Sequence, residues 1–132
     1  DCEVMAIVKA NAYGHGAGNR SGASPALGIG RFAVASVDEG IALRQAGVSA
    51  SIVVLGALFE EQVLDLVAHK LTPVVSDGQI LPALAKAARS HTSPYPIHLK
   101  VETGMGRLGF SSEELLSLLD NPLLRNPLKS KA

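Results

Sequence analysis

Short apolar runs alternate with helical patterns along most of the chain, and this alternation limits the folds that it can adopt. Five runs have the length and residue types of buried strands, and they cover residues 4–8, 31–35, 51–55, 72–75 and 97–101. Parallel strands need a crossover connection, and segments with helical character occupy most of the gaps. The order β(αβ)₄α therefore predicts a parallel α/β sheet with right-handed crossovers.

Capping signals mark the starts of two predicted helices. Ser36 is followed three residues later by Glu39, and Ser111 by Glu114, which is the spacing of a capping box. Two further segments, residues 60–70 and 79–89, have helical periodicity, and Ser76 or Asp77 is the expected cap of the helix over 79–89. The four expected helices thus run from Ser36 to Gly47, over 60–70, over 79–89 and onward from Ser111. The expected buried face of the helix over 60–70 consists of Val63, Leu64, Leu66 and Val67, and that of the last helix consists of Leu115, Leu116, Leu118 and Leu119.

Two segments give weak structural signals. Residues 11–30 are rich in glycine, and they predict at most a short helix over 25–29. Residues 121–132 contain two Asn-Pro dipeptides, and we expect a turn and a frayed end there. A closed eight-stranded barrel typically needs about 250 residues. The chain has 132 residues and begins at Asp1 with strand-like sequence almost at once, so we expect residues 1–132 to be an incomplete barrel with about the first five parallel strands.

Composition excludes several classes of partner. Charged residues make up 18% of the chain, below the usual share of about 25%, which suits strands that are covered on both faces. Formal net charge is zero, so neither nucleic acid nor an anionic membrane surface is an expected partner. The single cysteine, Cys2, cannot form an internal disulfide. Without a signal peptide or an apolar span of transmembrane length, a cytoplasmic location is expected.

A lysine ends the first apolar run. Taken alone, Lys9 is most simply a solvated lysine at the end of a strand. The functional alternative is an amine at the mouth of an α/β barrel, where it can attack a carbonyl group and form a Schiff base. Tyr13 follows four residues later, and it either packs against the first loop or donates its phenol to a phosphate or carboxylate.

A second candidate segment follows the fifth predicted strand. Residues 104–109 read GMGRLG and match G-x-G-x-x-G, but a dinucleotide fingerprint belongs in a first βα turn, so the match is weak. Arg107 in this loop presents a charged fork to an anion or lies free in solvent. Lys100 lies on a strand that is expected to be buried, so it needs a partner or a modification, and Glu102 is the nearest candidate. The four histidines have no ligand spacing, and no metal site is expected.

These segments together resemble alanine racemases. Residues 8–16, VKANAYGHG, are similar to the pyridoxal-phosphate signature of that family. The resemblance continues through residues 32–44 and 53–56 and returns at residues 98–109, in the family's order and at compatible spacing. It implies an N-terminal (β/α)₈ TIM barrel, a C-terminal β domain, a homodimer and a cytoplasmic enzyme that interconverts L-alanine and D-alanine for peptidoglycan.

The resemblance also implies roles for individual residues. Lys9 looks like the lysine that holds pyridoxal phosphate as an aldimine and moves the proton on the D-alanine side, and Tyr13 looks like a phosphate ligand. Arg107 looks like the arginine near the cofactor phenolate oxygen and the substrate carboxylate. Lys100 matches a lysine that many members carry in carbamylated form. Leu55 and Met105 fall in the matching segments as supporting residues.

The chain also departs from the family. Glu102 stands where the family usually has aspartate, and the last three barrel strands and the β domain with its catalytic tyrosine have no counterpart. We therefore expect a truncated and inactive fragment. The alternatives are a non-catalytic half barrel that binds pyridoxal phosphate, a structural remnant, or a small carrier or racemase of another barrel family. The AYGHG and GMGRLG segments argue against the last of these.

Overall fold

Six strands form one parallel sheet in sequential order. The computed structural model describes residues 3–17, 29–89, 94–124 and 128–131. Each strand pairs in parallel with the next along the chain. The strands are β1 (Met5–Ile7), β2 (Arg31–Val34), β3 (Ser51–Val54), β4 (Thr72–Val75), β5 (Tyr95–Leu99) and β6 (Leu128–Lys131). The prediction of a parallel α/β sheet is confirmed.

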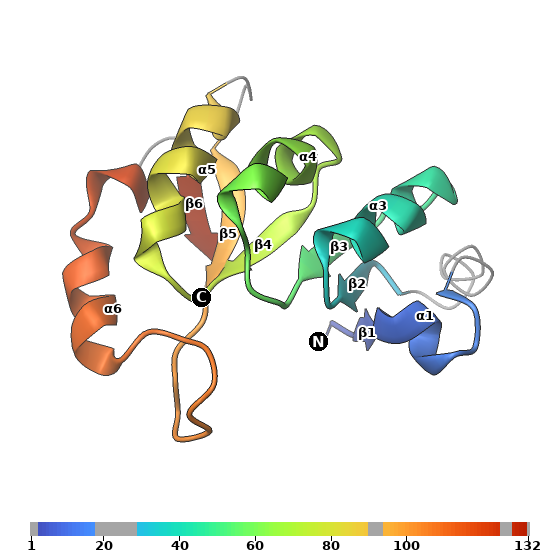
Figure 1. Cartoon of the computed structure of the whole chain (residues 1–132), viewed down its shortest axis with the longest axis horizontal. Helices are drawn as coiled ribbons and strands as arrows, with labels where there is room; N and C mark the ends of the chain where they lie inside the picture. The colour runs from blue at the N-terminus through green and yellow to red at the C-terminus, as the bar shows by residue number, and fades with distance from the viewer. Residues whose placement is uncertain (1–2, 18–28, 90–93, 125–127, 132) are drawn as a thin grey trace.

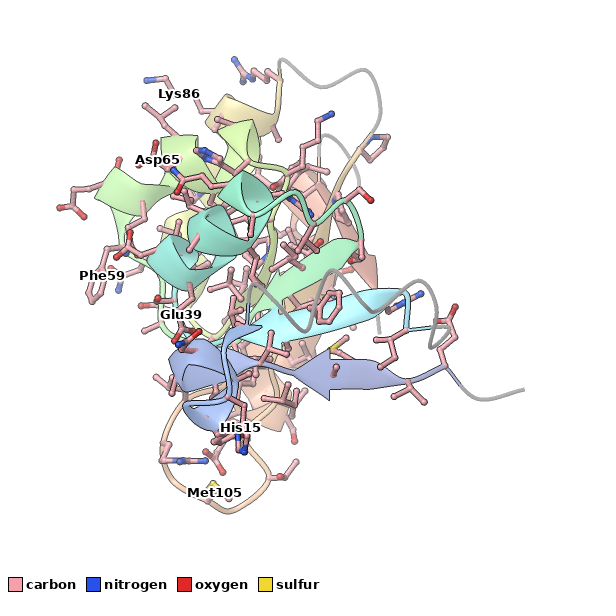
Figure 2. The ribbon with its side chains drawn as sticks, turned by 90° about the vertical axis from the view of Figure 1, so that its right-hand side faces the viewer. His15, Glu39, Phe59, Asp65, Lys86 and Met105 are labelled. Carbon is pink, nitrogen blue, oxygen red and sulfur yellow. The ribbon has the colours of Figure 1, made fainter. Side chains whose placement is uncertain are left out.

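The crossover helices lie along one side of the strands (Figures 1 and 2). The helices are α1 (Lys9–Tyr13), α3 (Val37–Gln45), α4 (Val63–Ala68), α5 (Leu81–Ala88) and α6 (Ser112–Leu119). Short 3₁₀ turns occupy Glu60–Gln62, Gly78–Ile80 and Pro122–Leu124. None of the described helices has both the length and the apolar character needed to cross a bilayer.

Side-chain caps start the helices where the sequence predicts them. Ser36 Oγ accepts a hydrogen bond from the Glu39 amide at 3.3 Å, which begins α3. At α6, Ser111 Oγ accepts from the Glu114 amide, and the Glu114 carboxylate accepts from the Ser111 amide, so the capping box is complete. Asp77, rather than Ser76, caps the turn before α5.

The core lies between the strands and the helices that cover them. In β2 and β3, three consecutive residues are buried, which are Phe32, Ala33 and Val34 in one and Ile52, Val53 and Val54 in the other. Successive residues of a strand point to opposite faces, so both faces of the sheet are covered at its centre. This burial agrees with the low charged fraction of the sequence.

The end of the chain corrects two predictions. Residues 128–131 are not a frayed end, because they form β6 beside β5 with Leu128 opposite Tyr95. The sheet therefore has six strands instead of about five. Leu128 is fully buried, and β5 supplies backbone partners along the whole of β6. Pairing with β5 therefore makes a strand of a segment whose sequence, with only one large apolar residue, has a weak local preference for one. The predicted helix over 25–29 lies outside the described residues, except for Ile29.

Three leucines are exposed that the sequence places in buried faces. Leu64 in α4 is 73% exposed, and Leu116 and Leu119 in α6 are 67% and 49% exposed. The inward face of α4 is narrower than expected, because Val63, Leu66 and Val67 already fill it at helical spacing. In α6, only the stripe of Leu115 and Leu118 packs against the core.

Both edges of the sheet lead to a prediction about association. Within the described residues, β1 pairs only with β2, and β6 pairs only with β5. Beside the β1 edge, Val4 and Ile7 are 63% and 42% exposed. An unpaired strand edge with apolar side chains is a template for pairing with another chain. We expect the 132-residue chain to form dimers or larger species that light scattering detects after size-exclusion chromatography, and a monodisperse monomer at high concentration would contradict this.

Candidate functional site

The carboxyl ends of the strands bring the sequence-predicted residues to one edge of the sheet. Lys9 comes two residues after β1, and Lys100 directly follows β5. Because all the strands are parallel, both lysines lie at the same edge. Figure 2 shows His15, just after α1, and Met105, in the loop that follows Lys100, at the same end of the molecule.

Lys9 begins an unusual left-handed turn. Ala10, Asn11, Ala12 and Tyr13 all have positive φ, between 50° and 55°. Residues with a Cβ avoid this region at a cost of about 1–2 kcal/mol each, and such strain tends to collect at functional sites. Asn11 tolerates a left-handed backbone as a single residue, but the local sequence does not predict a run of four, because alanine and tyrosine have no preference for this conformation.

Local hydrogen bonds close the turn. The Gly14 amide donates to the Ala10 carbonyl at 3.0 Å, and the Gly16 amide donates to the Asn11 carbonyl at 2.9 Å. Asn11 Oδ1 also accepts from the Ala17 amide at 2.8 Å, while His15 Nδ1 lies 3.0 Å from the Ala12 carbonyl oxygen. His15, which stands between two glycines, therefore helps to shape this loop.

Glu39 joins the turn to the next βα unit. One carboxylate oxygen accepts from the Ala10 amide and the other from the Ala35 amide, each at 2.7 Å. The capping-box prediction at α3 is thus correct for Ser36 and wrong for Glu39. The carboxylate reaches past the Ser36 amide, because two donors from neighbouring strand ends converge on it.

The side chains of Lys9 and Tyr13 are accessible. Lys9 is half-buried and Tyr13 is 60% exposed. Within the described residues, neither side chain makes a hydrogen bond or an ion pair. The amine belongs to the residue before the strained turn and the phenol to its last residue, and both side chains are accessible.

Glu102 organises the loop that carries Arg107. Its carboxylate accepts from the Gly104 amide at 2.6 Å and from the Arg107 amide at 3.1 Å. Backbone N–H groups of Gly106, Arg107, Gly104 and Met105 hold the pKa of Glu102 down at about 2. Among the described residues no ion pair joins Glu102 to Lys100, so the pairing that the sequence suggested is wrong. The carboxylate instead folds back over its own loop.

The base of this loop is closed by backbone pairing. The Phe110 amide donates to the Lys100 carbonyl at 2.8 Å, and the Glu102 amide donates to the Phe110 carbonyl at 2.9 Å. Arg107 is exposed on the loop and lines an open groove between residues 57–60, the β4–α5 connection and α6. The guanidinium is therefore open to solvent at this groove, which is compatible with both alternatives that the sequence left open for Arg107.

The remaining candidates lie nearby on the same edge. Lys100 is half-buried, and its amide continues the sheet by donating to the Val75 carbonyl. Leu55 directly follows β3, is half-buried and pairs through its amide with the Val34 carbonyl. Met105 is 71% exposed at the loop. The sequence indicated only a capping role for Glu39, through its place at the third helical position. Its contact with the backbone after Lys9 was not predicted.

The low pKa of Glu102 predicts how the loop responds to acid. The carboxylate is ionised in the folded loop down to about pH 2, whereas an ordinary glutamate gains its proton near pH 4.5. Its contribution to loop order should be complete above about pH 5 and should disappear as the pH falls through about 2. In an NMR titration, the Gly104 and Arg107 amide shifts should follow this low pKa, and Glu102→Gln should abolish the response. Glu113→Gln is the control, and a midpoint near pH 4.5 would contradict the prediction.

In the part of the chain that the structure describes, a parallel α/β sheet carries Lys9 after its first strand and the Arg107 loop after its fifth, which defines an α/β domain of the barrel type. The family model for "Alanine racemase, N-terminal domain" matches residues 1–129, and the chain belongs to this family. The resemblance seen in the sequence is therefore confirmed.

Individual relatives agree with this assignment. Alanine racemase of Carboxydothermus hydrogenoformans is 42% identical over 124 residues, which are 94% of this chain and 34% of that protein. The solved alanine racemase of Clostridium difficile 630 superposes with a TM-score of 0.89 at 28% identity, over 100% of this chain and 35% of that one. A histidine racemase from Leuconostoc mesenteroides gives a TM-score of 0.83 at 30% identity, over 96% of this chain and 34% of that one. The chain thus spans about a third of the length of these relatives.

Proposed function

We propose that this chain supplies a pyridoxal-phosphate-binding part of an alanine racemase, with Lys9 as the cofactor lysine. The observation that carries the proposal is the position of Lys9, which follows the first strand and opens a strained turn at the carboxyl edge of the sheet. Its amine has no protein partner within the described residues. Family membership supports the same role.

The donor set fits the chemistry of pyridoxal phosphate. The Lys9 amine is a nucleophile for an aldehyde, the Tyr13 phenol is a hydrogen-bond donor for a phosphate, and Arg107 offers a cation to an anionic oxygen. When bound, the cofactor supplies an electron sink for the negative charge that develops on the substrate. Lys9 would hold the cofactor at rest and, once the substrate amine has displaced it, would move a proton on one face of the substrate, while Arg107 would meet the substrate carboxylate.

Supporting roles go to three further residues. Lys100 lies at the start of the Arg107 loop, where a carbamate on its amine would turn a half-buried cation into an anion facing that arginine. Leu55 and Met105 border the site. Racemisation needs a base on each face of the substrate, and Lys9 provides one of them.

The complete reaction is proposed for an assembly larger than these 132 residues. The chain spans about a third of its relatives, and we propose that alone it does not racemise alanine. Interconversion of L-alanine and D-alanine for peptidoglycan, a homodimer and a cytoplasmic location belong to the same proposal. The alternative is a half barrel that binds the cofactor without catalysis, or a structural remnant. A histidine racemase shares this region at 30% identity, so alanine is proposed from the family and not from this half of the site.

The test of Lys9 is cofactor attachment. The chain is incubated with pyridoxal phosphate, dialysed, reduced with borohydride and digested, and mass spectrometry locates the added cofactor mass. We expect a visible absorbance band that survives dialysis and a modified peptide that contains Lys9. Lys9→Ala should remove both signals completely, because the nucleophile is gone.

Lys86→Ala is the matched control, since Lys86 is an exposed lysine on α5. It should leave attachment unchanged. An absent band in the wild-type chain, or a band that persists in Lys9→Ala, would overturn the assignment. Formation of D-alanine from L-alanine by the wild-type chain would show instead that the 132 residues are a complete catalyst.

A further inference from the structure

The Glu39 carboxylate connects three segments at the candidate site. It belongs to the first turn of α3, and its two oxygens accept from the Ala35 amide after β2 and from the Ala10 amide after Lys9. Both distances are 2.7 Å, which is typical of charge-assisted hydrogen bonds. Figure 2 shows Glu39 at the point where α3 meets the start of α1.

Hydrogen bonds to neighbouring segments hold the backbone on both sides of Lys9. The Val8 amide donates to the Ala33 carbonyl at 2.9 Å and continues the sheet up to the residue before the lysine. The Ala10 amide, directly after the lysine, donates to Glu39. The Ala12 amide donates to the Val8 carbonyl at 2.9 Å, and the other hydrogen bonds given above for residues 10–16 stay within the turn or reach Ala17. Glu39 therefore anchors the turn to a separate element.

The left-handed turn needs such an anchor. Four consecutive residues with a Cβ have positive φ, so the isolated segment would relax to an ordinary conformation. Strained backbone persists only where the surrounding structure holds it. A relaxed turn would rotate the backbone that carries Lys9 and change the direction of its amine.

We propose that Glu39 is a positioning residue for Lys9, and that its carboxylate sets the left-handed turn and thereby the attachment of pyridoxal phosphate. The role in attachment rests on the proposed function, whereas the role in the turn does not. The requirement is for a carboxylate, because both oxygens accept from N–H donors. Glutamine can accept with one oxygen only, and its NH₂ group would then face a donor.

The first experiment measures attachment. Glu39→Gln should weaken pyridoxal-phosphate binding about tenfold, the effect of losing roughly one charge-assisted hydrogen bond. Ser36→Ala removes the cap of the same helix but leaves the carboxylate in place. Ser36→Ala should lower the midpoint of thermal unfolding and leave the affinity for pyridoxal phosphate within about twofold of wild type. Asp38→Asn, which removes the neighbouring charge in the same helical turn, should also leave the affinity within about twofold.

The second experiment needs no cofactor. NMR measures the backbone couplings of residues 10–13, which report φ, and the amide shifts of Ala10 and Ala35. Glu39→Gln should lose the positive-φ signature and shift both amides, while Ser36→Ala should retain the signature. If Glu39→Gln does not fold, Glu39→Asp, which keeps the charge but shortens the reach, takes its place in both experiments.

The outcomes separate the two proposals. If the wild-type chain attaches no cofactor at Lys9, the proposed function fails, and with it the role of Glu39 in attachment, while the couplings still decide whether Glu39 sets the turn. A Glu39→Gln chain that keeps the left-handed turn overturns the inference. A chain that loses the turn but keeps wild-type affinity also overturns it, because Lys9 then needs no positioning. An equal loss of affinity in Ser36→Ala would show that Glu39 acts only through the general stability of α3, and this result would also overturn the inference.

Discussion

Replacing Arg44 with alanine should lower the free energy of unfolding by about 3 kcal/mol, because its guanidinium satisfies four backbone carbonyls. Nη1 donates to Val48 and Ala50 at 2.7 Å each, Nε donates to His69 at 2.9 Å, and Nη2 donates to Lys70 at 3.0 Å. The side chain thus joins the α3–β3 connection to the end of α4. Burial lowers the pKa of the Arg44 guanidinium, which fits a cation that is partly removed from water and held by these acceptors.

Urea unfolding followed by circular dichroism measures this effect. Arg44→Lys should recover only part of the loss, because a single ammonium group cannot reach four carbonyls in the geometry of a planar fork. Arg89→Ala removes an exposed arginine that has no side-chain partner within the described residues, so it should change the free energy by less than about 0.5 kcal/mol. A loss below about 1 kcal/mol in Arg44→Ala would contradict the bracing role.

Gly109→Ala should be the second strongly destabilising change, with a loss of about 3 kcal/mol. A Cβ at this position would lie 2.6 Å from the Glu102 nitrogen and 2.9 Å from the Val101 carbonyl carbon, both of them backbone atoms. The φ of Gly109 is +138°, which side chains rarely adopt. The backbone pairing between Val101 and Phe110 would have to open, and the loop that carries Arg107 would lose its base.

A neighbouring glycine separates the steric effect from the effect of φ. Gly106 has a φ of +68°, and a Cβ there meets no atom within 4 Å. Gly106→Ala should therefore cost only about 1 kcal/mol, the usual strain of a left-handed alanine. Urea unfolding gives both values, and the amide shift of Phe110 reports whether the base of the loop has opened. Equal losses in the two variants would show that close approach of the backbone at Gly109 is unimportant.

The two glycine variants should also differ in how they affect ligand binding at Arg107. In Gly109→Ala, the loop that carries Arg107 loses the backbone pairing at its base, whereas in Gly106→Ala the Glu102 carboxylate still accepts from the backbone N–H groups of the loop. Weak binding of an anion such as inorganic phosphate at Arg107 should fall in the first variant and persist in the second. This result would connect the stability of the loop to its proposed ligand.

Much of the fold was predictable because local signals agree with it. The five apolar runs became strands, and Ser36 and Ser111 start helices through their side chains. Periodicity failed where it counted too many leucines as buried, as with Leu64 and Leu116. Pattern reasoning identifies an apolar stripe, but the width of the covered face depends on which elements pack against it.

The sequence proposes the residues of the candidate site, and the structure adds their geometry. Lys9 is half-buried and Tyr13 and Arg107 are exposed, so their roles in ligand binding stay predictions. The carboxylate of Glu102 was assigned to the wrong partner, and Glu39 was taken for a simple cap. Both errors have one cause, because sequence spacing does not say which backbone N–H groups converge on a carboxylate.

The sequence by itself determined the parallel α/β class, the helix starts and the position of Lys9 at the end of the first strand, because each depends on residues close together in the chain. Only the tertiary structure decided the pairing of β6, the bracing by Arg44 and the left-handed turn after Lys9. Each of these depends on partners more than one element away, such as Tyr95 opposite Leu128 or Glu39 against Ala10. The turn is the clearest case, because its residues disfavour the conformation locally and hold it beside a carboxylate from another helix.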